Sequence, residues 1–249
     1  MTSHAGRTLA ALSLALVPLS LSLSAPAQAA PAPPAAPAPA PVAAPAPAAP
    51  APPAEPAEIH QLEDAISLLV ETEEDRTGYT PAAFRHWNEG RDPADGCATD
   101  REVLLAEAVD EAAHSAGCAV TGGRWVSYYD NQSSNRVSSM TVDHVVPLAE
   151  AWGSGASQWT AERREAYAND QDSPATLAAV TKRVAREKGD QDITHWLPPE
   201  TSAICRYVGD WVGTKLRWGL TPDKAELEAL KLFADNSCET TIVRFTRVP

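Results

Sequence analysis

Apolar residues recur at helical spacing from residue 59 onward, directly after the alanine- and proline-rich stretch. The positions that share one helical face are Ile59, Leu62, Ile66, Leu69 and Val70. They predict an amphipathic helix over residues 59–75. Thr80 followed by Pro81 is typical of a helix start, so we expect a short helix there. A further helix is expected over residues 102–114.

Two apolar stretches in the middle of the chain favour strands. Residues 125–129 and 138–144 are separated by the turn-forming residues 130–135, which predicts a hairpin between them. A shorter apolar run, residues 177–180, is followed by Thr181, which can cap a helix over residues 182–188.

Helices are also expected around and after these strands. The predicted ranges are 149–152, 161–169, 202–218 and 222–235. The class should therefore be α+β, mostly helical around a small sheet, and we expect one domain over residues 59–249.

The first part of the chain predicts export. Residues 1–29 have a positive start at Arg7, an apolar run and a small-residue cleavage motif, which is typical of a secretory signal peptide and not of a membrane span. Residues 30–58 are almost entirely alanine and proline, which favours a semi-rigid linker, with an inert tail as the alternative. We expect a secreted protein, extracellular or associated with the cell wall.

Charge restricts how this chain can bind nucleic acid. The 33 acidic and 20 basic residues give a net charge of -13, which becomes -14 when Arg7 leaves with the signal. An overall field of this sign repels phosphates, so any positive surface must be local. One basic run, Lys182, Arg183, Arg186 and Lys188, is opposed only by Glu187. It indicates either phosphate contact or a solvated helix face.

An acid and an imidazole stand side by side at the end of the second predicted strand. Asp143 and His144 lie within an apolar stretch that stops at Pro147. A carboxylate can hold a hard divalent cation while neutral imidazole accepts a proton from water. Metal-assisted phosphodiester hydrolysis needs both of these parts. A buried, hydrogen-bonded structural histidine is the alternative.

The residues around this pair form an ordered set that extends over most of the folded part. The set includes residues 78–79, Phe84, residues 86–87, residues 97–104, residues 143–156, Trp159, Arg163 or Arg164, residues 167–170, residues 177–180, residues 188–190, residues 196–199, residues 205–207 and residues 220–221. It resembles the secreted bacterial branch of the HNH endonuclease family, from about Ile59 to Cys238. The resemblance implies a ββα-metal (HNH) core, with Asp143 as metal ligand, His144 as general base and Mg²⁺ or Mn²⁺ as cofactor.

Further site residues follow from this resemblance. Lys188 is expected to act with His144 in catalysis by holding the scissile or a neighbouring phosphate. Lys182, Arg183 and Arg186 are expected to bind phosphates of the substrate. Glu150 should support the site from the first helix after the motif.

Several positions depart from the family pattern, namely Asp100, Thr176, Ala185 and Ile193, and Ala185 bears most directly on metal binding. Ala185 stands where related sequences carry an asparagine that completes the protein ligands of the cation, and alanine cannot coordinate a metal. Asp190, beyond Gly189, is the residue best placed to substitute for it as a second metal ligand. Glu187 lies about 200° round the helix from Ala185 and therefore cannot replace the missing ligand on a regular helix. We expect weakened metal binding.

The cysteines are expected to stabilise the fold. Four cysteines in an exported chain favour disulfides over a zinc site, because there is no Cys-x-x-Cys pair. Three pairings are open from the count alone. The sequential pairing, Cys97 with Cys118 and Cys205 with Cys238, is expected because each pair brackets a predicted helix and because the resemblance suggests it.

Three interpretations of function remain open. The first is a secreted, divalent-metal-dependent endonuclease that acts on DNA in preference to RNA. The second is an inactive exported module with an HNH fold that binds nucleic acid or a wall polymer. The third is a phosphodiesterase with a different substrate. The sequence predicts no membrane association and indicates no protein partner.

Overall fold

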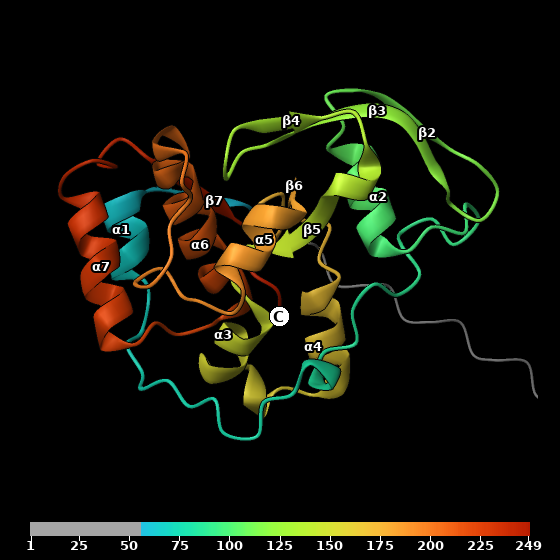
Figure 1. Ribbon diagram of the computed structural model, residues 1–249. Coiled ribbons are helices and arrows are strands. Elements are labelled where there is room, and N and C mark those ends of the chain that lie inside the picture. Colours follow the sequence, from blue (N-terminus) through green and yellow to red (C-terminus); the bar gives the residue numbers. More distant parts are fainter. Residues whose placement is uncertain (1–55) are drawn as a thin grey trace, which may run out of the picture. The chain divides into compact units, whose positions relative to one another are not determined.

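The computed structural model describes residues 56–249 (Figure 1). The predicted signal peptide and nearly all of the predicted linker lie outside these residues. The strands are β1 Glu58–Gln61, β2 Asp110–His114, β3 Val120–Ser127, β4 Gln132–Ser134, β5 Met140–His144, β6 Leu177–Thr181 and β7 Ile242–Phe245. The helices are α1 Leu62–Ser67, α2 Thr99–Ala106, α3 Leu148–Gly153, α4 Ala161–Ala168, α5 Lys182–Lys188, α6 Ile204–Trp218 and α7 Lys224–Ala234. Short 3-10 turns are Pro81–Ala83, Val137–Ser139, Ala156–Gln158 and Thr201–Ala203.

This mixture of helices and small sheets is an α+β arrangement, as predicted. Strands β5 and β6 pair antiparallel, with Asp143 opposite Ala178 and His144 opposite Leu177. Helix α5 begins directly after β6, where the Thr181 hydroxyl accepts a hydrogen bond from the Val184 amide at 3.3 Å. The predicted strand, cap and helix over residues 177–188 are therefore present.

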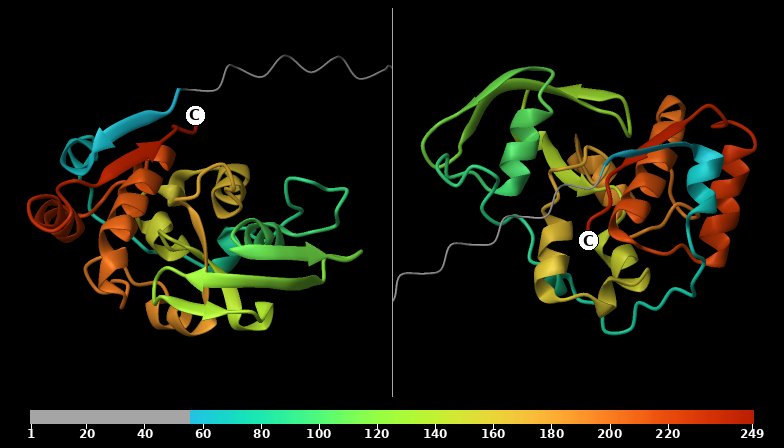
Figure 2. Two further views of the ribbon diagram at one scale, coloured as in Figure 1. Left: turned by 90° about the horizontal axis from the view of Figure 1, so that it is seen from above. Right: turned by 180° about the vertical axis from the view of Figure 1, so that it is seen from behind.

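The prediction of one helix over residues 59–75 was wrong. Residues 58–61 form β1, which pairs antiparallel with β7 close to the C-terminus, and the helix α1 covers only residues 62–67 (Figure 2). Val70 remains 69% exposed, so the end of the predicted apolar face buries little. A partner strand about 180 residues away leaves no trace in local periodicity.

The predicted hairpin also pairs differently. Strand β3 lies between β2 and β4 in a three-stranded sheet, and β5 pairs with β6 instead of with β3. The expected helix over residues 102–114 ends at Ala106, because residues 110–114 form β2 on the edge of β3. In Figure 1 this sheet lies above α5 and the β5–β6 pair.

Two apolar clusters bury the β5–β6 pair from both faces. The larger one surrounds α6 through Tyr207, Val208, Trp211 and Val212 and includes Val180 of β6. The smaller one lies under α2 and includes Val142 and Ala179. Strand β6 is therefore buried along almost its whole length, which explains its continuous apolar run.

Both disulfides of the expected sequential pairing are formed. Cys97 is bonded to Cys118, and Cys205 is bonded to Cys238. The first closes the loop that contains α2 and β2, and the second ties the start of α6 to the segment after α7. Among residues 56–249, no helix is long and apolar enough to span a membrane.

Candidate active site at the end of β5

The strand geometry separates the side chains of Asp143 and His144. Successive side chains of a strand point to opposite faces. Asp143 therefore faces α5, whereas His144 faces the C-terminal end of α4 and the segment around Trp87. The pair shares one strand end but occupies two different environments.

On the α5 side, Asp143 forms a buried ion pair. Its Oδ2 accepts hydrogen bonds from Lys188 Nζ at 2.7 Å and from the Tyr129 hydroxyl at 3.0 Å. The same ammonium group donates to the His144 carbonyl oxygen at 2.7 Å. The Lys188 side chain is 0% exposed and that of Asp143 is 14% exposed. Burial raises the pKa of Asp143, although Lys188 and Tyr129 favour the ionised form.

On the other side, His144 is fixed as a neutral imidazole. Its Nε2 lies 2.8 Å from the Ala168 carbonyl oxygen, which can only accept, so the ring proton lies on Nε2 and the lone pair on Nδ1. The pKa of His144 is lowered to about 4, mainly by burial and also by the charges of His86 and Lys188, against the opposing effect of the Ala168 hydrogen bond. A base that is already neutral at physiological pH can accept a proton from water.

Two aromatic rings enclose the imidazole of His144. Trp87 stacks on it with centroids 5.2 Å apart and planes at 20°, and Tyr167 lies at 6.2 Å and 23°. Trp87 has φ 57°, a backbone conformation that bulky residues rarely adopt and that costs roughly 1–3 kcal/mol. Strain of this kind persists only where the surroundings impose it.

Hydrogen bonds from α2 and the α4 C-terminus impose this conformation. The backbone amide of Asn88 donates to Asn169 Oδ1 at 3.2 Å, and the side-chain oxygen Oδ1 of Asn88 accepts from the Thr99 hydroxyl at 3.1 Å. Asn169 Nδ2 also donates to the Arg85 carbonyl oxygen at 2.8 Å. The segment that contains Trp87 is thereby bound to the C-terminal end of α4, the same helix end whose Ala168 carbonyl oxygen accepts the hydrogen bond from His144.

The predicted basic run does not form one surface. Lys182, Arg183 and Arg186 are exposed on α5, whereas Lys188 points into the core. Arg183 already pairs with Asp130 at 2.9 Å and with Glu187 at 2.6 Å. Only two members of the run, Lys182 and Arg186, have no ion pair with a described residue.

Two further positions bear on metal binding, Ala185 and Asp190. Ala185 is half-buried and packs against the larger apolar cluster. Gly189 ends α5 with φ 53°, and the exposed Asp190 follows. The Asp190 carbonyl oxygen accepts from Arg76 Nη1 at 3.0 Å, and its charge contributes to the raised pKa of Asp143.

Glu150 lies in a buried charge network beside the site. Its Oε1 accepts from Lys215 Nζ at 2.8 Å and its Oε2 from Arg76 Nη2 at 2.7 Å. Lys215 is 0% exposed and also binds Glu226 at 2.7 Å. Glu150 thus joins α3 to α6, α7 and the segment that precedes Tyr79, a contact set in keeping with a supporting role.

Two clusters of acidic, histidine or cysteine side chains in residues 56–249 are compact enough for a metal. One comprises Cys97, His114 and Cys118, whose cysteines are bonded to each other. The other comprises Glu74, Glu150 and Asp192, with Arg76 bound to both glutamates. Neither includes Asp143 or Asp190.

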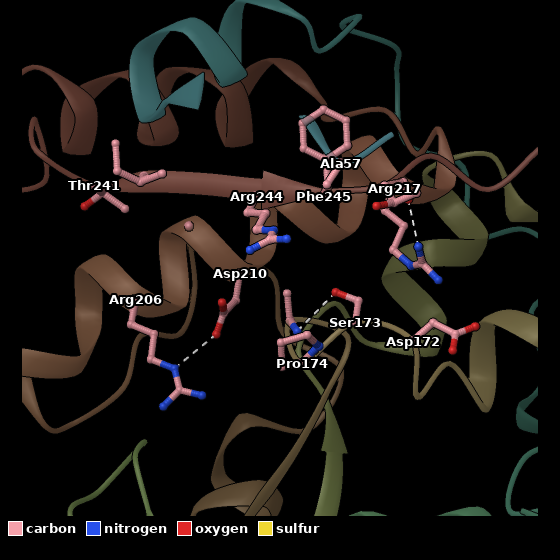
Figure 3. Close-up of a pocket in the computed structure, with 14 residues that line it drawn as sticks. Ala57, Asp172, Ser173, Pro174, Arg206, Asp210, Arg217, Thr241, Arg244 and Phe245 are labelled. Carbon is pink, nitrogen blue, oxygen red and sulfur yellow. Dashed lines mark hydrogen bonds and ion pairs between the residues drawn. The ribbon is translucent and has the colours of Figure 1, made fainter. Parts of the chain in front are cut away.

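A cavity of about 610 Å³ lies away from these residues, between α6, β7 and the loop 172–175 (Figure 3). Its arginines are partly engaged within the protein. Arg217 binds Asp170 at 2.7 and 2.9 Å, and Arg206 lies 3.4 Å from Asp210. Neither Asp143 nor His144 lines it.

Several site residues could not be found from sequence. Tyr129 lies in a predicted strand, but nothing in its spacing indicated a contact with Asp143. Trp87 belongs to the resembling set, yet its stack on His144 depends on a contact across 57 residues. Lys188 was expected at a phosphate, and the structure brings its ammonium group to Asp143.

The chain is similar to one protein family and to one secreted fungal protein. Residues 102–230 match the family model described as GmrSD restriction endonucleases, C-terminal domain. A secreted protein of the fungus Arthroderma benhamiae, itself uncharacterized, is 37% identical over 163 residues, which cover 66% of this chain and 78% of the relative. No solved structure matches. Because the relative is fungal, the expected restriction to a bacterial branch is not supported. The secreted relative and the two disulfides agree with the predicted extracellular location.

Proposed function

Because this chain belongs to the family of GmrSD restriction endonuclease C-terminal domains, we propose that it is a secreted endonuclease that hydrolyses phosphodiester bonds of DNA. The family model covers residues 102–230, which include Asp143, His144 and the whole of α5. Strands β5 and β6 followed by α5 are the arrangement expected of a ββα-metal core. The proposal assigns the chemistry to the end of β5.

The observation that carries the proposal is the state of His144. Its Nε2 proton is held by the Ala168 carbonyl oxygen at 2.8 Å, which leaves the lone pair of Nδ1 as the only basic position on the ring. In the proposed reaction Nδ1 takes the proton of the attacking water. Trp87 and Tyr167 stack on the imidazole and fix the orientation of its plane. The hydrogen bond to the Ala168 carbonyl oxygen fixes the direction in which Nε2 points within that plane.

Asp143 and Lys188 are given a positioning role in this scheme. Lys188 Nζ binds both Asp143 Oδ2 and the His144 carbonyl oxygen, so it fixes the side chain of Asp143 and the backbone of His144 at the same strand end. A side chain that is 0% exposed cannot contact a phosphate in this conformation. The phosphate-binding role expected of Lys188 stays a prediction that would require its release from Asp143.

The residues around Asp143 do not fit a divalent cation well. One carboxylate oxygen already accepts hydrogen bonds from an ammonium group and a hydroxyl group, and Ala185 offers no ligand atom. Mg²⁺ and Mn²⁺ prefer several oxygen ligands. The expected cofactor, Mg²⁺ or Mn²⁺, therefore stays a prediction, and we derive no step of the reaction through it.

The second candidate is a binding module that has lost catalysis. The ion pair between Asp143 and Lys188 and the alanine at position 185 favour it, because both reduce the affinity of this strand end for a cation. The binding module would keep the fold and the exposed cations of α5, Lys182, Arg183 and Arg186. It predicts DNA binding without cleavage.

Plasmid nicking by the purified protein separates the two candidates. We expect supercoiled DNA to be converted to open circles with Mn²⁺ or Mg²⁺, and we expect His144→Ala to abolish the conversion. His195→Ala is the matched control, because its side chain is 72% exposed and binds only neighbours within three residues. A parallel reaction with chelator measures the need for a cation. If the protein binds DNA but nicks it under none of these conditions, the proposal of an enzyme is refuted and that of a binding module is supported.

A further inference from the structure

A positively charged groove runs beside α5, on the face opposite to Lys188. It has a volume of about 500 Å³ and lies between the first turns of α5 and the segment 132–139 that contains β4. Arg136 from this segment faces Lys182, Arg183 and Arg186 from α5 across the groove. The acidic residue that lines it is Asp130.

The free positive charges of the groove come from two separate parts of the chain. Arg183 is neutralised by Asp130 and Glu187. Arg136, Lys182 and Arg186 are exposed and form no ion pair or side-chain hydrogen bond with a described residue. Three unpaired cations around one groove give this surface a local positive charge in a chain whose net charge is -13.

Arg136 is held in place by its own turn. The Arg136 amide donates to Ser134 Oγ at 3.0 Å, and the Ser139 hydroxyl donates to the Arg136 carbonyl oxygen at 2.8 Å. The two serine hydroxyl groups lie 2.7 Å apart. The backbone on both sides of Arg136 is thereby fixed, which keeps the base of its side chain at the edge of the groove.

Hydroxyl groups add uncharged donors to the same surface. Ser133 and Ser138 line the groove, and both are exposed. Their hydroxyl groups form no hydrogen bond with a described residue. Arginine, lysine and serine side chains are the groups that proteins use most to hold phosphate oxygens of a nucleic-acid backbone.

We propose that Arg136, Lys182 and Arg186 form a track that binds the phosphate backbone of the nucleic acid next to the cleavage site. This inference rests on the proposed function for the identity of the ligand. Thr181 in the groove pairs with Met140, which precedes Asp143 by three residues on β5. At about 3.4 Å per strand residue, the Thr181 end of the groove lies roughly 10 Å from Asp143. The track therefore holds flanking backbone and not the scissile phosphate.

The test measures DNA binding separately from cleavage. Fluorescence anisotropy with a labelled DNA duplex is recorded from 50 to 200 mM salt on the full chain that carries His144→Ala, or His144→Asn if the first fails to fold. Arg136→Gln, Lys182→Gln and Arg186→Gln are each added to this background. Each should weaken binding and make the log–log salt slope shallower by about 0.9, the value for one lost phosphate contact. Lys224→Gln on α7, 77% exposed, is the remote control and should keep the slope.

The possible outcomes separate this inference from the proposed function. Shallower slopes for the three groove variants and an unchanged slope for Lys224→Gln support the track, even if the native protein never cleaves DNA. If Arg136→Gln and Arg186→Gln both keep the slope, the track is refuted, even if the native protein cleaves. Binding of heparin, but not of DNA, through the same residues would also refute it and would indicate an anionic polysaccharide instead.

Discussion

Replacing Lys188 by methionine tests whether the ion pair with Asp143 stabilises the candidate site. Methionine keeps most of the buried volume of the lysine stem but removes its charge. The change leaves the Asp143 carboxylate without its counter-charge and the His144 carbonyl oxygen without its donor. Both losses occur at the junction of β5 and α5, where Lys188 is 0% exposed.

The expected loss of stability follows from this burial. Breaking a buried ion pair by removing one partner costs about 3–5 kcal/mol, whereas exposed pairs contribute about 0–1 kcal/mol. Because Asp143 keeps 14% exposure and can take up a proton, we expect the lower end, about 3 kcal/mol. The double variant Asp143→Asn with Lys188→Met should lose clearly less than the sum of the single variants, because no unpaired charge remains.

Urea unfolding at pH 7 under non-reducing conditions measures these differences. Lys182→Met is the matched control, since this exposed lysine lies on the same helix and should change the free energy of unfolding by no more than about 0.5 kcal/mol. A loss below about 1 kcal/mol for Lys188→Met, or additive losses in the double variant, would refute a stabilising buried pair.

Two further predictions concern pH and metal binding. Burial raises the pKa of Asp210 from 3.8 to about 6, so the folded state holds a proton that the unfolded state loses, and stability falls as pH rises from 3.8 to 6. Asp210→Asn should therefore raise the free energy of unfolding at pH 7.5 by up to about 3 kcal/mol and change it little at pH 4, as thermal unfolding at both values would show. Ala185→Asn should increase Mn²⁺ affinity, measured by calorimetry, and Asp143→Ala in that background should remove the gain. An unchanged affinity in a protein that nicks DNA well would mean that another group, with Asp190 first, already serves as ligand, whereas an unchanged affinity without nicking would refute a cation site at Asp143.

The sequence predicted the parts of the fold that depend on local signals. Capping residues and helical periodicity act within a few positions of the chain. They correctly predicted the cap at Thr181, the helix over residues 182–188, and the helices α6 and α7. The disulfide pairing was also predicted correctly. The capping and helix signals need no knowledge of distant partners, whereas the cysteine pairing was predicted from the helices that each pair brackets and from the family resemblance.

Strand pairing and the contacts of the site depend on distant partners. β1 was mistaken for helix because its partner, β7, follows about 180 residues later. The contact between Lys188 and Asp143 spans 45 residues, and nothing in the run of basic residues showed that one member would turn inward. The burial of α5 on one side decided this, since residues 186 and 188 point about 200° apart on a helix.

The charge of the chain explains why a local track matters. With a net charge of -13, long-range attraction cannot bring a polyanion to this protein, so binding must rely on contacts made at short range. The fold concentrates free cations by bringing Arg136 to the first turns of α5, while Asp130 and Glu187 neutralise Arg183. Nucleic-acid affinity should therefore depend more steeply on these few side chains than it would in a basic protein, where many cations share the phosphates.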